Sequence, residues 1–294
     1  MDQDSNQLLE YTIDTLLKTF NPDCKPIMKK VHFYKMMDIL DTRLQDQDID
    51  IGYPKYWYRY GSVAHLDLLD ELIPYGFSRY WIGNSIVYPA KHRRFYEIDR
   101  KIKHIINSTI ENLRKKYQYK QDYGRLLKKD SYKLNSPYIF NTTFQYYLDS
   151  IDSLKMQNSL YASNDLLEPL LDKLLAEFPE NDYPELLDTH LAWDDTTRLV
   201  LDHMQESKEK YYCLEKLTML FWGIYSKAIR IDYNQHIPKD IISDWEQEYG
   251  SSIHNIDLKI EEIRNEVIEN CDFTINTDDK LIKKLMQKIY ELGA

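Results

Sequence analysis

Apolar residues recur at steps of three and four along most of the chain, which is the spacing of amphipathic helices. In the first third, this pattern predicts helices over residues 5–20, 26–44 and 62–73. Ser suits the start of a helix, and Pro suits the first turn but not the interior. Pro22 and Pro74 follow the first and third segments, where each would end a helix. We therefore expect three helices before residue 75.

Two β-prone runs come next, at residues 77–82 and 85–88, on either side of Gly83 and Asn84. A two-residue turn that contains Gly between such runs is typical of a β-hairpin. Three helices followed by a hairpin is the element order of a winged helix. The sequence thus predicts a winged-helix-like unit at the N-terminal end.

Beyond residue 90 the periodicity is helical almost throughout, apart from a predicted loop at 131–138 and a polar, aperiodic segment at 149–165. We interpret the polar segment as a linker. The predicted helices cover residues 91–118, 121–129, 139–148, 166–178, 184–205, 213–231, 238–271 and 277–292. The predicted fold is mainly α, with a winged-helix-like unit and basic helices in residues 1–150 and a helical domain in residues 151–294.

Residues 52–61 read Gly-Tyr-Pro-Lys-Tyr-Trp-Tyr-Arg-Tyr-Gly, and five of the eight residues between the glycines are aromatic. We call this segment the aromatic stretch. Aromatic side chains bury large areas and dominate the energetics of cores. Because apolar helices are predicted on both sides, we expect Trp57 to be part of the core and not an exposed binding residue.

Charge is distributed unevenly along the chain, whose net charge is -10. Residues 91–130 hold 13 Lys and Arg against 5 Asp and Glu, whereas the rest of the chain is acidic. The basic residues either pair with acidic groups of the protein itself or bind an acidic partner or a nucleic acid. The candidate binding residues are Lys91, Arg93, Arg94, Arg100, Lys101, Lys103, Arg114, Lys115 and Lys116.

Composition narrows the class of protein. The chain has 294 residues, of which 43% are hydrophobic, enough for a sizeable core. Its longest apolar run, residues 217–225, is much shorter than the roughly 18 residues that a membrane span needs. Three scattered cysteines fit a reducing compartment better than a disulfide framework. We expect a cytoplasmic protein with no membrane partner.

Two segments carry resemblances to known families. The helix pattern Met-Lys-Lys-Val-His-Phe-Tyr at residues 28–34, followed by Tyr60-Gly61, resembles the SocA-like antitoxin (Panacea) domain, although Ser62 stands where that family has Pro. The aromatic stretch and the Trp-Asp-Asp-Thr-Thr-Arg run at residues 193–198 are similar to an uncharacterised archaeal family. The first resemblance implies a regulatory or defence-associated role, and the second implies no known activity.

Few catalytic patterns occur in the chain. The eight glycines are too widely spaced for a phosphate-binding loop, and no paired Cys-x-x-Cys motif is present. His190 and Asp194 lie one helical turn apart, but a pairing of Asp194 with Arg198 explains that spacing without a metal. We therefore expect no metal site and no cofactor.

A ribonuclease of the HEPN type uses an Arg followed four to six residues later by His. Arg198 and His203 fit this pattern within a predicted helix, where Arg would stabilise phosphate charge and His would move a proton. Arg59 with His65 and Arg230 with His236 fit it as well, and three matches are a mild excess over chance for so loose a pattern.

Binding of DNA in the usual winged-helix manner is disfavoured, because residues 62–75 contain Asp67, Asp70 and Glu71 but no Lys or Arg. We therefore expect a non-enzymatic interaction or regulatory module that binds a protein partner, in a defence or toxin–antitoxin-like system. Two alternatives stay open: a nucleic-acid-binding component that uses the basic helices at 91–129, and a HEPN-like ribonuclease that uses Arg198 and His203.

Overall fold

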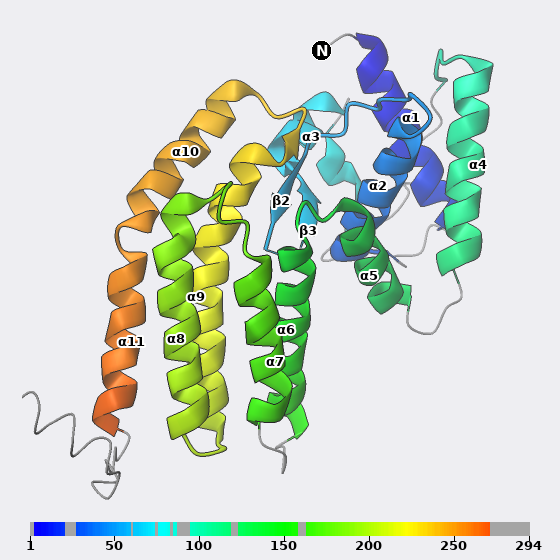
Figure 1. Cartoon of the computed structure of the whole chain (residues 1–294). Coiled ribbons are helices and arrows are strands. Elements are labelled where there is room, and N and C mark those ends of the chain that lie inside the picture. Colours follow the sequence, from blue (N-terminus) through cyan, green and yellow to red (C-terminus); the bar gives the residue numbers. More distant parts are fainter. Residues whose placement is uncertain are drawn as a thin grey trace, which may run out of the picture.

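The computed structural model describes residues 3–20, 28–59, 61–73, 76–82, 85–86, 95–118, 123–157 and 163–270. Within these ranges the protein is mainly helical, as predicted, and it has two small antiparallel sheets where the sequence predicted a single hairpin. Figure 1 shows α1, α2, α4 and α5 gathered on one side of the molecule and the helices from α6 onward on the other. Strands β2 and β3 lie between the two groups.

The N-terminal group is built around α2 (Lys30–Gln45), which α4 and α5 contact. Before it come α1 (Gln3–Phe20) and β1 (Met28–Lys29). The middle of α2, residues 35–41, is buried all round, and Met36, Met37 and Leu40 are completely inaccessible to solvent. A helix enclosed in this way has no face left for water, so its polar residues must find partners inside the protein.

Part of the aromatic stretch forms a strand, and the residues that follow it form a second strand. This corrects the prediction that a third helix starts at Ser62. Strand β2 (Lys55–Tyr58) pairs with β3 (Gly61–Ala64), with Trp57 opposite Ser62. Strand formation satisfies the backbone polar groups of a buried segment, and Gly61 takes the positive φ of 89° at the turn. The third helix, α3 (Leu66–Leu72), begins later and is capped by His65.

The predicted hairpin is present. After the short 3-10 helix η1 (Phe77–Tyr80), β4 (Trp81–Ile82) pairs with β5 (Ser85–Ile86), and β5 pairs in turn with β1. Its turn at 83–84 and residues 87–88 lie outside the described residues. The strands β2 and β3 are an addition to the predicted winged-helix order, because they separate the second helix from the third.

The basic region contains two helices with boundaries that differ from the prediction. Helix α4 (Arg100–Tyr117) starts at Arg100, because the carboxylate of Asp99 accepts hydrogen bonds from the first backbone N–H groups. Helix α5 (Tyr123–Asn135) includes residues 131–135, which were expected to be a loop. Ser131 and Tyr132 are buried, and their packing explains the extension.

The predicted linker at 149–165 is wrong where the structure describes it. Helix α6 (Ile139–Gln157) runs through residues 149–157, and α7 (Ser163–Glu177) starts at Ser163. Ile151 and Leu154 are buried while Asp152 and Ser153 are exposed, so the polar residues form the outer face of a helix. The expected division between residues 150 and 151 falls inside α6, and a separation into two domains stays a prediction.

The remaining helices complete a bundle in which α9 contacts α6, α8, α10 and α11. The predicted helix at 238–271 is interrupted at residues 254–255, and the one at 277–292 lies outside the described residues. The elements are η2 (Pro184–Leu186), α8 (Leu187–His203), α9 (Lys208–Asp232), β6 (Asn234–Gln235), α10 (Lys239–Ile253) and α11 (Ile256–Asn270).

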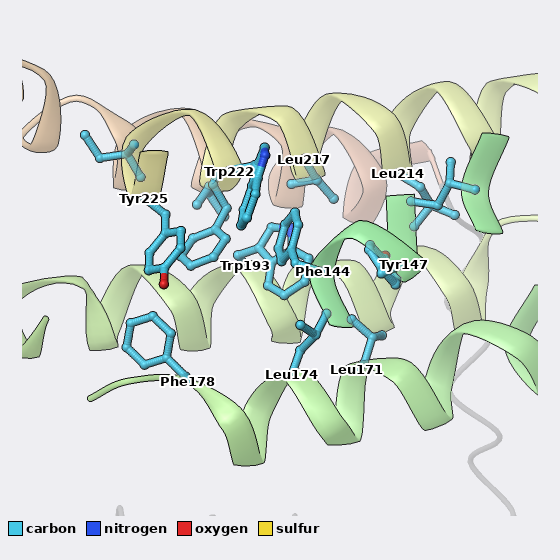
Figure 2. Packing of buried hydrophobic residues seen from close by; sticks show 14 of the residues in the cluster. Phe144, Tyr147, Leu171, Leu174, Phe178, Trp193, Leu214, Leu217, Trp222 and Tyr225 are labelled. Atoms are coloured by element: carbon cyan, nitrogen blue, oxygen red, sulfur yellow. The ribbon is translucent and has the colours of Figure 1, made fainter. Parts of the chain in front are cut away.

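The buried apolar residues form two clusters, which we call the N-terminal core and the bundle core. The N-terminal core draws on segments between Leu9 and Leu127. Apart from Trp57, the bundle core lies between Tyr132 and Val267, and it is rich in aromatic rings, including the stacked pair Phe144 and Trp222 (Figure 2). Trp57 is 3% exposed and belongs to the bundle core, which confirms its predicted burial.

Candidate functional site

A row of polar side chains runs along one face of α2. Lys35, Asp38, Thr42 and Gln45 follow one another at steps of three and four residues, which places them on the same side of a helix. Strand β3 and helix α5 contact this helix. Lys35 is 3% exposed and Asp38 is 1% exposed, so the row is enclosed by protein.

Lys55, at the start of β2, supplies a positive charge to this row. Its Nζ lies 3.3 Å from Oδ1 of Asp38 and 2.9 Å from Oδ2 of Asp41. The hydroxyl of Ser131 donates a hydrogen bond of 2.8 Å to Oδ2 of Asp38, and the amide of Gln45 donates one of 3.1 Å to Oδ2 of Asp41. We call Lys55, Asp38 and Asp41 the buried ion cluster. It contains one more carboxylate than ammonium.

The surroundings keep Lys55 protonated. Burial acts to lower its pKa, but the attraction and hydrogen bonds of Asp38 and Asp41 outweigh this, and the pKa of Lys55 is raised. Burial raises the pKa of Asp41, and Lys55 opposes that shift. At neutral pH the lysine is therefore a fixed hydrogen-bond donor and not a nucleophile.

The buried ion cluster borders a pocket of about 280 Å³. Helix α2 and strands β2 and β3 form part of its wall, and the segment from the end of α9 through β6 forms another part. We call this hollow the polar pocket. Its lining includes Asp38, Gln45, Lys55, Trp57, Asn135 and residues 232–235.

Hydrogen bonds across the polar pocket join elements that are distant in the sequence. The amide of Gln45 donates to the side-chain oxygen of Gln235 at 3.1 Å, which links α2 to β6. The hydroxyl of Thr42 donates to Asn135 at 2.8 Å. Nδ2 of Asn135 and Nε1 of Trp57 are buried donors without a hydrogen-bond acceptor within the described ranges. The pocket wall thus holds hydrogen-bonding capacity that the protein leaves unused.

Lys35 lies beside this site but faces a different environment. Its Nζ is 5.1 Å from the ring centre of Tyr132, and burial lowers the pKa of Lys35 to about 8. A Cβ atom added at Gly61 would displace this ammonium, and the positive φ of Gly61 independently favours glycine at this position.

The predicted basic residues do not form one compact site. Lys91, Arg93 and Arg94 lie outside the described residues. Arg114 pairs with Glu111, and Nζ of Lys116 lies 2.7 Å from Asp130. The Nζ of Lys103 donates to the backbone oxygen of Tyr96 at 2.6 Å. Part of the positive charge of residues 91–130 is therefore satisfied inside the basic region itself, while Lys128 pairs with Asp149 of the acidic C-terminal half at 2.9 Å.

Arg100, Lys101 and Lys115 are exposed and have no ion pair within the ranges that the structure covers. At a rise of about 1.5 Å per residue, Lys101 and Lys115 are about 21 Å apart along α4. These three cations are available to a partner, but Arg100 and Lys101 lie at the start of α4 and Lys115 lies near its end.

Arg198 has a structural role in α8. Its guanidinium donates to Asp194 at 2.8 Å and to Asp172 at 2.9 Å, which confirms the predicted pairing with Asp194 and ties α8 to α7. His203 is exposed and lies five residues further along, about 140° around the helix from Arg198. The two side chains therefore point in different directions and do not converge on a position where both could contact one phosphate group of an RNA.

No group of three or more His, Cys, Asp or Glu that could hold a metal ion occurs among the described residues. His190 instead lies inside the bundle core, stacked on Phe178 with ring centres 4.3 Å apart. Burial lowers the pKa of His190 to about 4. His190 is therefore a neutral ring packed in the core, and this packing accounts for its position one helical turn before Asp194 without a metal ion.

Sequence reasoning missed the polar pocket, although one signal was present. The polar row on α2 has helical spacing, but a polar face ordinarily indicates contact with water. Burial of that face depends on β3, which the sequence predicted as the start of a helix, and on the end of α5, which it predicted as a loop. Lys55 was likewise visible within the aromatic stretch, but its carboxylate partners could not be identified from the sequence.

No helix in the described part of the chain combines the length and apolar composition of a membrane span. Comparison of the chain with family models, with curated proteins and with solved structures found no match. The resemblances to the SocA-like antitoxin domain and to the archaeal family stay predictions.

Proposed function

We propose that the protein is a non-enzymatic regulatory module whose polar pocket binds a small molecule that bears hydroxyl or amine groups and no negative charge. The observation that carries this proposal is the buried ion cluster of Lys55, Asp38 and Asp41 on the wall of the pocket. Burial of three charges is a weak source of stability, because desolvation offsets much of the attraction. Recognition of a polar ligand would explain why the protein keeps these three charged groups buried beside the pocket.

The charge of the pocket favours this class of ligand. Asp38, Asp41 and Asp232 lie in or beside the wall against the two cations Lys55 and Lys35, so the excess charge is negative and disfavours an anion. Hydroxyl groups can donate to carboxylates and accept from amides, and amines can donate to carboxylates. A volume of about 280 Å³ is at the small end of ligand pockets, which suits a single sugar, an amino sugar or a short amine.

The position of the pocket supports a regulatory role. Its walls come from α2 and β2 on one side and from the end of α9 and β6 on the other. A ligand that contacts both sides stabilises the arrangement in which they are joined. A protein partner that recognises this arrangement would then respond to the ligand. The defence-related context implied by the SocA-like resemblance is compatible with such a module.

The chemistry of the cluster supports binding over catalysis. Each carboxylate already accepts a hydrogen bond from Lys55, and each accepts another, from Ser131 or Gln45. Lys55, Ser131 and Gln45 thereby hold the two carboxylates in fixed orientations, as a preorganised binding site requires.

Calorimetric titration and thermal shift with glucose, glucosamine and spermidine test the proposal, with glucose 6-phosphate as the anionic counterpart. We expect at least one uncharged or cationic compound to raise the Tm and glucose 6-phosphate to have no effect at this pocket. Asp232→Asn keeps the acceptor that Tyr183 uses at 3.0 Å but removes a charge, so it should weaken the binding of a cationic ligand several-fold.

The matched control is Asp240→Asn, which makes the same change at an exposed position of α10 away from the pocket. It should leave the Kd unchanged. Failure of every compound to bind, or equal weakening by both variants, would contradict a ligand site here. Co-purification of the tagged protein from its host, with and without the ligand, tests the protein partner.

Binding of a nucleic acid by α4 is the second candidate, supported by the exposed cations Arg100, Lys101 and Lys115. Three contacts with phosphate predict weak binding, with a slope of log K against log salt of about -3. Titration of a fluorescent duplex at several salt concentrations measures that slope. Arg198 is committed to two carboxylates, so the geometry favours a structural role for it over a HEPN-like ribonuclease.

A further inference from the structure

A second pocket, of about 300 Å³, lies at the other end of β2. It is formed where Arg59, just after β2, meets α9 and the junction of α10 with α11. We call it the basic pocket, because Arg59, Lys227 and Lys259 line it and no Asp or Glu does so among the described residues. In a chain with a net charge of -10, such a gathering of cations requires an explanation.

Arg59 is held in place without a carboxylate partner in the described part of the chain. Its backbone oxygen accepts a hydrogen bond of 2.6 Å from Nε1 of Trp222, which fixes the backbone against α9. The guanidinium lies against Gly223, where an added Cβ would stand 2.9 Å from Nη2. Nε is buried and has no acceptor within the described ranges. A partly buried guanidinium without an anion is unfavourable, and an arriving anion would relieve that cost.

The nearby charges leave the basic pocket positive. Glu248 pairs with Lys227 at 3.0 Å and also with Arg230, so it offsets one of these two cations. Lys259 is exposed on the first turn of α11 and has no ion pair within the described residues. Arg59 and Lys259 thus remain uncompensated at the pocket.

Neutral donors complete the set. The hydroxyl groups of Ser251 and Ser252 and the amide of Asn255 line the same pocket. Ile256, at the start of α11, lines it as well, and the N-terminal end of a helix favours negative charge. This combination of a guanidinium, ammonium groups and hydroxyls is the donor set that recognises phosphate.

We propose that the basic pocket binds the phosphate group of a small phosphorylated organic molecule. Leu220, Ile224 and Ile256 give the pocket an apolar part beside its cations. An organic group attached to the phosphate would be buried against these side chains, which a free phosphate ion cannot exploit. The site is separate from the polar pocket, and its test does not depend on the function proposed there.

Calorimetric titration of the full-length protein with phenyl phosphate and with inorganic phosphate, in a buffer without other phosphate, tests the proposal. We expect phenyl phosphate to bind with a Kd in the millimolar range or tighter and inorganic phosphate to bind more weakly. Arg59→Gln should weaken the binding of phenyl phosphate about tenfold or more, because it removes the charged donor. Lys259→Gln, at an exposed position where folding is not at risk, should weaken it less.

Arg264→Gln is the matched control. This arginine lies on α11, the helix that carries Lys259, but it pairs with Asp195 at 2.6 Å and does not line the pocket. It should leave the Kd unchanged. Absence of binding, or equal Kd values for wild type, Arg59→Gln and Lys259→Gln with intact circular dichroism, would overturn the site. Equal affinity for phenyl phosphate and inorganic phosphate would overturn the organic part of the ligand.

Discussion

Lys55, Lys35 and His190 are all buried, and their neighbours decide how each is charged. Two carboxylates raise the pKa of Lys55 despite its burial. Burial lowers the pKa of Lys35 to about 8, because the attraction of Asp38 compensates it only in part. Aromatic rings surround His190, so burial acts there without an opposing charge and lowers its pKa to about 4. Lys55 is thus a permanent cation, Lys35 is a lysine that titrates closer to neutral pH, and His190 is a neutral imidazole.

His190 makes stability depend on pH in a defined window. An unfolded histidine has a pKa of about 6.5, so between pH 6.5 and pH 4 the unfolded state binds more protons than the folded state. Stability due to the buried neutral ring is therefore complete above pH 6.5 and is lost as the pH falls towards 4. The expected loss is about 3 kcal/mol in the free energy of unfolding. Urea unfolding at a series of pH values measures it.

His190→Phe is the informative variant for this window. Both ring nitrogens of His190 lack a hydrogen-bond partner among the described residues, so a phenyl ring sacrifices no such bond. The variant should match wild type at pH 7 or exceed it slightly, and should lose less stability by pH 4. His104→Gln, at an exposed position, should keep the wild-type profile. An unchanged slope in His190→Phe would show that other groups control the acid response.

At the scale of elements, the aromatic stretch shows which structural features a local sequence pattern predicts and which it does not. Its composition predicted that Trp57 is buried, because large apolar side chains next to amphipathic helices have few other places. Its strand conformation was not predicted, since the partners of β2 are Gly61–Ala64, read as the start of a helix, and Asn234–Gln235, almost 180 residues away. Pairing with so distant a segment is a tertiary effect that periodicity does not contain.

The same limit explains the missed continuation of α6. Residues 149–157 expose Asp152 and Ser153 and bury Ile151 and Leu154, and so sparse an apolar face is weak as a sequence pattern. Contacts with α7 and α9 supply the stabilisation that local propensity lacks. The polar pocket was missed for a related reason, because it exists only where α2, β2 and β6 meet.

A proline at position 152 distinguishes the helix from a linker. Asp152 lies in the interior of α6 and is exposed, so its side chain contributes little to packing. Asp152→Pro removes a backbone hydrogen bond and clashes with the preceding turn, which costs about 3 kcal/mol or more in a helix. We expect a clear drop in the Tm measured by circular dichroism. Asp152→Ala, which favours helix, should equal or exceed wild type, and a proline variant that melts like wild type would restore the linker.

At the scale of the whole molecule, the two cores meet around β2. The sequence predicted two units that divide at residue 150, whereas the buried clusters change over between Leu127 and Tyr132. Strand β2 crosses this division, because it pairs with β3 on one side and contacts α9 and pairs with β6 on the other. Trp57 reaches from β2 to Tyr132, with ring centres 5.3 Å apart. Strand β2 is therefore one tie between the N-terminal core and the bundle, beside α5, which contributes Leu127 to the first core and Tyr132 to the second.

Trp57→Ala tests whether this strand couples the two cores. Removal of a buried tryptophan costs about 3–5 kcal/mol, and here the loss falls at the junction. We expect wild type to unfold in a single transition and Trp57→Ala to unfold in two, because a weaker junction lets one core melt before the other. Calorimetry gives the number of transitions. Phe144→Ala is the control, since it removes a buried ring deep in the bundle core and should lower stability without first separating the cores. Two transitions in wild type would show that the cores are independent, whereas one lowered transition in Trp57→Ala would show that contacts other than Trp57 couple them.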